Sequence, residues 1–77
     1  MSKRKFDIDI GHRMAEECYR IFGTQRNTAK ILQCDRKNVY YWETLGLVPS
    51  LGFVIRLHHF GGDVMYVLFG KRGGQNV

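Results

Sequence analysis

The chain has 77 residues, of which 44% are hydrophobic and 25% are charged, so it is long enough for one small domain and too apolar for a disordered chain. Its apolar runs fall far short of the roughly 20 residues that a membrane-spanning helix needs, and no signal peptide is visible, which predicts a cytoplasmic protein. Twelve lysines and arginines against seven aspartates and glutamates give a net charge of +5, which favours an anionic partner, above all nucleic acid.

The chain begins with a basic segment, residues 1–7, which lacks helical periodicity and is predicted to be a flexible arm. Either Asp7 or Asp9 can cap the helix that follows, because a carboxylate accepts the free N–H groups of a first turn. Gly23 is a natural stop for this helix. Between these positions, apolar residues recur at helical spacing: Met14, Cys18, Ile21 and Phe22.

A second helix is predicted over residues 25–32, with Thr24 as its cap and with Ala29 and Leu32 facing the core. A tight break at residues 33–34 follows. Asp35 then caps a third helix that ends before the next glycine and proline. The core face of this third helix is predicted from apolar residues spaced three apart: Val39, Trp42 and, as a further candidate, Leu45.

Two more short helices complete the chain. Ser50 is predicted to cap the first of them, and Asp63 the second, which covers residues 64–69. The inner side of the helix after Ser50 is expected to hold Leu51, Val54, Ile55, Leu57 and His58 or His59. With no strand pattern, the sequence predicts an all-α bundle of about five short helices over residues 8–70 and a flexible tail over 71–77.

Residues 24–42 have the pattern of two short helices that cross steeply across a turn of three or four residues. A small residue is needed where such helices meet, and Ala29 stands there, while Trp42 is expected to fix the second helix in the core. The other faces of that helix are rich in hydrogen-bond donors and aromatic rings: Arg36, Lys37, Asn38, Tyr40 and Tyr41. In the major groove, Arg and Lys can donate to guanine and Asn can pair with adenine.

The run TQRNTAKILQCDRKNVYYWETLGLVPS resembles the helix-turn-helix of the lambda-repressor-like family, which includes phage repressors and Cro-type proteins. That family shows a Thr-Gln start, a small residue, an apolar pair, a Ser-like cap, a Val, then Trp-Glu and Gly-x-x-Pro. The run IRLHHFGGDVMYVLFGKR is similar to its last two helices, so the resemblance covers about residues 8–72. The family usually has Gly in the turn where this chain has Gln33, and a left-handed residue other than glycine costs about 1 kcal/mol.

The resemblance implies a sequence-specific repressor, of phage or prophage type, that binds double-stranded DNA as a homodimer with helix 35–44 in the major groove. The residues expected to contact bases are Asp35, Arg36, Lys37, Asn38 and Tyr41. Those expected to contact phosphates are Thr24, Gln25, Arg26, Lys3, Arg4 and Lys5. Separately, the last helix has more apolar residues than one face can bury, and the excess is a candidate dimer surface: Val64, Met65, Tyr66, Leu68 and Phe69.

Two alternatives stay open. A protein-interaction module, such as an antitoxin-type or regulatory partner, would use the same fold, and an exposed aromatic residue such as Tyr40 suits that role. The run VYYWETLGLVP also suggests a MerR-like or excisionase-like DNA binder. That fold needs a basic β-wing after Pro49, where residues 50–60 have a helical pattern.

The sequence lacks the patterns typical of an enzyme. It contains no nucleophile-and-base pair, phosphate-binding loop or metal motif at interpretable spacing. Cys18 and Cys34 are expected to be reduced and buried, and together with His58 and His59 they do not have the ligand spacing of a zinc site. We therefore expect no catalytic residue, metal or cofactor.

Overall fold

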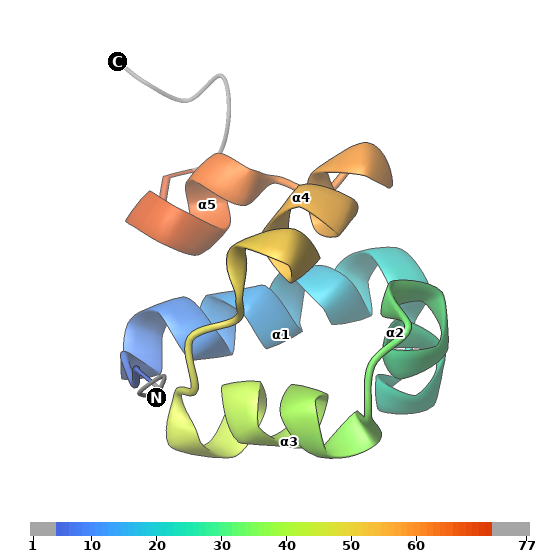
Figure 1. Cartoon of the computed structure of the whole chain (residues 1–77). Coiled ribbons are helices and arrows are strands. Elements are labelled where there is room, and N and C mark those ends of the chain that lie inside the picture. The colour runs from blue at the N-terminus through green and yellow to red at the C-terminus, as the bar shows by residue number, and fades with distance from the viewer. Residues whose placement is uncertain (1–4, 72–77) are drawn as a thin grey trace.

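The computed structural model describes residues 5–71, which form five α-helices and no β-strand, as the sequence predicts. In chain order the helices are α1 (Ile8–Phe22), α2 (Gln25–Leu32), α3 (Arg36–Leu45), α4 (Leu51–His59) and α5 (Val64–Phe69) (Figure 1). Over the described part of the chain, no helix is both long enough and apolar enough to cross a membrane.

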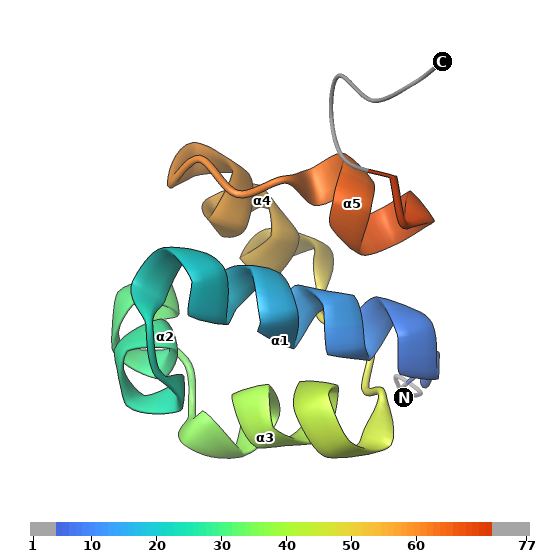
Figure 2. The ribbon, with the colours of Figure 1, turned by 180° about the vertical axis from the view of Figure 1, so that it is seen from behind.

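The longest helix, α1, is the centre of the fold. Helix α3 packs along one side of α1, α2 closes one end of that pair, and α4 and α5 lie on the opposite side (Figures 1 and 2). Trp42 of α3 is the largest buried side chain, with only 1% of its surface exposed. The other buried hydrophobic residues come from all five helices and one loop: Met14, Ala15, Cys18, Ala29, Leu32, Val39, Leu47, Val54, Leu57 and Val67.

Most predicted helix caps are confirmed. The Asp7 carboxylate accepts hydrogen bonds from the N–H groups of Asp9 and Ile10, so Asp7 rather than Asp9 caps α1. Side chains cap three more helices in the same way: Thr24, Asp35 and Asp63. Ser50 occupies the cap position of α4 but makes no side-chain hydrogen bond to its first turn, so that predicted cap is only positional.

The predicted inner face of α4 is wrong at most positions. Val54 and Leu57, three residues apart, are buried, whereas Leu51 is 72% exposed and Ile55 is 47% exposed. His58 and His59 are exposed as well. At 100° per residue, Leu51, Ile55 and the two histidines share the side of the helix opposite Leu57.

The same geometry explains Leu45, which is 54% exposed instead of buried. Each step of three residues falls 60° short of a full turn, so two steps carry Leu45 about 120° away from Val39.

Cys18 is buried as expected, and burial raises the pKa of its thiol to about 12. The prediction that Cys34 is buried is wrong, because it is only half-buried; both cysteines are free thiols.

Part of the expected N-terminal arm belongs to the folded domain. The Lys5 carbonyl accepts a hydrogen bond from Val48 N–H at 2.8 Å, and Asp7 N–H donates to the Gly46 carbonyl at 2.7 Å. Between them, Phe6 and Leu47 form an isolated antiparallel bridge. The arm prediction for residues 5–7 is therefore wrong, because a loop 40 residues later supplies their backbone partners. The other expected arm residues, Lys3 and Arg4, lie outside the described residues.

Candidate nucleic-acid interface

The connection between α2 and α3 is short and strained. Gln33 has φ 59° and ψ 50°, in the left-handed region, and it is the one non-glycine residue with positive φ among the described residues. Cys34 N–H donates to the Ala29 carbonyl at 2.9 Å, which folds the chain back against the end of α2. Arg56 of α4 donates to the Leu32 carbonyl and braces the same helix end. This three-residue connection, 33–35, sets the direction in which α3 leaves α2.

Replacing Gln33 with glycine is expected to raise the free energy of unfolding by about 0.5–1 kcal/mol, because glycine has no side chain to strain a left-handed backbone. Urea denaturation measures this difference. The control is Lys30→Gly, at an exposed position inside α2, which should lower stability by a similar amount. Equal losses at both positions would show that the turn carries no strain.

Helix α3 has one buried face and one exposed cationic turn. Val39 and Trp42 are fully buried against α1, and both Arg36 and Lys37 are exposed in the first turn. The Asp35 carboxylate accepts a hydrogen bond from Lys37 N–H at 2.9 Å, which fixes the start of the helix. The predicted positions of the two cations on the solvent side of α3 are thus confirmed.

The start of α2 lies beside this turn. The Arg36 guanidinium donates to the Gln25 side-chain carbonyl at 3.3 Å, across a sequence separation of 11 residues. Arg26, next to Gln25, is exposed, and the Thr24 hydroxyl accepts a hydrogen bond from Asn27 N–H. The contact of Arg36 with Gln25 therefore brings the first turns of α2 and α3 together, and Arg26 and Lys37 are exposed in those same turns.

The two tyrosines of α3 differ in a way that the sequence did not predict. Their rings are in contact, with centroids 5.8 Å apart, but Tyr40 is 51% exposed whereas Tyr41 is half-buried against the core. Tyr40 directly follows the buried Val39, and Tyr41 directly precedes the buried Trp42. Helical periodicity alone therefore does not predict which of the two rings is more exposed. Tyr40 is therefore the more accessible ring, although Tyr41 was expected to face the DNA.

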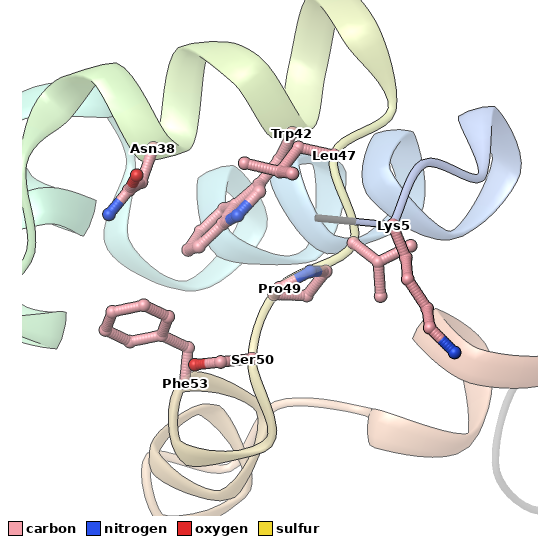
Figure 3. Close-up of a pocket in the computed structure, with 8 residues that line it drawn as sticks. Lys5, Asn38, Trp42, Leu47, Pro49, Ser50 and Phe53 are labelled. Carbon is pink, nitrogen blue, oxygen red and sulfur yellow. The ribbon is translucent and has the colours of Figure 1, made fainter. Parts of the chain in front are cut away.

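Lys5 lies away from the Arg36–Gln25 contact, whereas Asn38 belongs to the same first turn of α3 as Arg36. Lys5 is exposed and Asn38 is half-buried, and both line a cavity beside Trp42 (Figure 3). The backbone pairing of Lys5 with Val48 holds it there. Of the expected contact residues, Lys5 therefore lies away from the starts of α2 and α3, and Asn38 lies both in the first turn of α3 and at this cavity.

The five residues of the candidate dimer surface do not share one exposed face. Met65 and Phe69, one turn apart, are 55% and 64% exposed, and the other three are half-buried: Val64, Tyr66 and Leu68. The Arg13 guanidinium donates to the carbonyls of Val67 and Leu68, at 3.0 and 3.4 Å, and holds α5 against α1. The Tyr66 hydroxyl donates to the Glu16 carboxylate.

A second exposed apolar cluster was not predicted. Phe6, Ile8 and Leu45 are each more than half exposed, and the pairing of residues 5–7 with residues 46–48 brings them to the same end of the molecule. Their separation in sequence hid this cluster. Over the described residues, no group of three His, Cys, Asp or Glu side chains is placed to hold a metal ion.

Comparisons of the chain with models of protein families, with characterised proteins and with solved structures find no match. The chemistry of the exposed residues and their arrangement on α2 and α3 are therefore the basis for a function.

Proposed function

We propose that this chain binds double-stranded DNA in a sequence-specific manner, with α2, the turn and α3 acting as a helix-turn-helix and α3 entering the major groove. The observation that carries the proposal is the single surface formed by the first turns of α2 and α3, joined by the contact of Arg36 with Gln25. Helix-turn-helix proteins bind base edges with the first turns of their second helix. The burial of Val39 and Trp42 would hold α3 rigidly for that purpose.

The two helices would have different roles. Arg36 and Lys37 would donate to base edges, with Asp35, Asn38 and one of the α3 tyrosines close by. Thr24, Gln25 and Arg26 would contact phosphates, because the free N–H groups at the start of α2 carry partial positive charge. The net charge of +5 would attract the duplex before any base is contacted.

The proposal extends to a Cro-type repressor that acts as a homodimer. Two copies would place their α3 helices in successive major grooves about 34 Å apart, on a two-fold symmetric site. Occupation of a promoter by the dimer would then block transcription. Met65 and Phe69 are the exposed members of the candidate dimer surface on α5.

A protein-interaction role is the second candidate, and the exposed apolar side chains favour it. Tyr40 and the cluster of Phe6, Ile8 and Leu45 together present aromatic and aliphatic groups of the kind that protein interfaces use. A MerR-like or excisionase-like fold is not proposed, because α4 occupies the position after Pro49 where the β-wing would be needed.

Alanine variants test the assigned roles in DNA binding. Lys37→Ala is expected to cost about 1–3 kcal/mol of binding free energy on a preferred duplex and to relax base preference, because a base contact is lost. Arg26→Ala should weaken binding to all sequences alike, because it removes a phosphate contact. Fluorescence anisotropy on preferred and scrambled duplexes measures both effects.

The matched control is Lys71→Ala, which removes the same charge beyond α5, away from the α2–α3 surface. It should change affinity much less than either variant. The role assignment fails if Lys37→Ala and Arg26→Ala weaken binding to both duplexes equally.

A further inference from the structure

A cavity of about 360 Å³ lies between the N-terminal segment, α3 and the start of α4 (Figure 3). Its walls are mostly apolar. The rings of Trp42 and Phe53 have centroids 5.7 Å apart at an angle of 60°, and Leu47, Val48 and Pro49 complete the apolar lining. A volume of this size with such walls fits a small aromatic ring rather than a single ion.

Few polar groups line the cavity, and two of them, Asn38 and Lys5, lie at opposite ends. Figure 3 shows the Asn38 amide on the α3 side, beside the two rings, and Lys5 beyond Pro49 on the other side. Among the described residues that line the cavity, Lys5 is the one charged residue, and none of them is a carboxylate that would neutralise it. Ser50 also lines the cavity, and its hydroxyl makes no capping bond to α4. The charge of the lining therefore favours an anionic ligand.

We propose that this cavity is a binding site for a small aromatic carboxylate. The ring would pack against Phe53, in front of the largely buried Trp42, and the Lys5 ammonium would pair with the carboxylate. The Asn38 amide, at the far end, would donate a hydrogen bond to, or accept one from, a polar substituent on the side of the ring opposite the carboxylate. Asn38 belongs to α3, so a ligand bound in the cavity would contact the helix that we propose to enter the major groove.

The site goes beyond the proposed DNA binding and is tested without DNA, so either can fail alone. The probe is 4-hydroxyphenylacetate, followed through the indole N–H signal of Trp42, which is unambiguous because the chain has one tryptophan. We expect a saturable shift with a dissociation constant of about 1 mM, typical of a weak small-molecule site. The uncharged alcohol with the same ring should bind about tenfold more weakly, because it cannot pair with Lys5.

Variants locate the bound carboxylate. Lys5→Gln should weaken binding of 4-hydroxyphenylacetate about tenfold and leave the affinity for the alcohol unchanged. Lys30→Gln, at an exposed position on α2 that does not line the cavity, should leave both affinities unchanged. Thermal denaturation checks that each variant is folded.

Three results would overturn the proposal. The first is a Trp42 signal that does not saturate, and the second is equal binding of the acid and the alcohol. The third is a Lys5→Gln variant that loses affinity for duplex DNA but has an unchanged response to the carboxylate, since Lys5 would then contact phosphate instead.

Discussion

Replacing Gly11 with alanine is expected to lower the free energy of unfolding by about 3 kcal/mol or more, although alanine favours a helix more than glycine does. A Cβ atom at this position would lie 2.5 Å from the Gly46 Cα and 2.7 Å from the Trp42 carbonyl oxygen. Both neighbours are backbone atoms, so neither can move aside as a flexible side chain would. The backbones of α1 and the end of α3 would have to move apart, and Trp42 would become less buried.

The chain offers a matched control in Gly52, which is also helical. No heavy atom lies within 4 Å of a Cβ placed there, so Gly52→Ala should raise stability by about 0.5–1 kcal/mol through helix propensity alone. Urea denaturation of the two variants gives differences of opposite sign if α1 and α3 are in backbone contact. A gain in stability for Gly11→Ala would contradict that contact.

Replacing Glu17 with alanine is expected to cost about 3 kcal/mol of unfolding free energy. Glu17 is fully buried, its carboxylate pairs with the Arg20 guanidinium, and it accepts a hydrogen bond from Asp63 N–H at 2.8 Å. The same carboxylate thus joins α1 to the residue that caps α5. The alanine variant would lose both interactions and leave a cavity.

Glu16→Ala is the control for this variant, because it removes the same charge from the adjacent position of α1. Glu16 is exposed and accepts a hydrogen bond from the Tyr66 hydroxyl at the surface, so its loss should cost less than about 1 kcal/mol. Glu17→Gln should fall between the two, since an amide oxygen can still accept from Asp63. Calorimetric unfolding of all three variants measures their losses of stability. Equal losses for Glu16→Ala and Glu17→Ala would refute the proposed link between α1 and α5 through Glu17.

The parts of the fold that could be predicted from sequence are those determined locally. Caps such as Asp7, Thr24 and Asp35 act on N–H groups within three residues, so their chemistry is visible in a short window. The inner face of α4 could not be predicted in this way. Its nine residues include apolar side chains all around the helix, so only packing decides that Val54 and Leu57 are buried.

Long-range contacts account for the remaining failures. Residues 5–7 have no periodicity of their own, and their order depends on backbone partners at 46–48. The close contact of Gly11 with Gly46 spans 35 residues of sequence, so no short sequence window could predict it. The cavity beside Trp42 is assembled from three separate segments and was not predicted at all.

The candidate site was predicted in its charged residues but not in its aromatic ones. Arg36 and Lys37 follow a cap residue, and charged residues in a first turn remain exposed unless they are paired, so their position could be inferred. The contact of Arg36 with Gln25 needed the angle between α2 and α3, which the left-handed Gln33 determines.

Selection of binding sites from a random double-stranded DNA library, with excess non-specific competitor and about 0.15 M salt, tests the proposed DNA binding most directly. We expect enrichment of a two-fold symmetric motif whose half-sites lie one helical turn apart, about 34 Å. The enriched motif should bind Lys37→Ala more weakly than the unchanged protein. Weak binding that is indifferent to sequence and disappears as salt rises would contradict the proposal, because the positive charge would then attract DNA without distinguishing its bases.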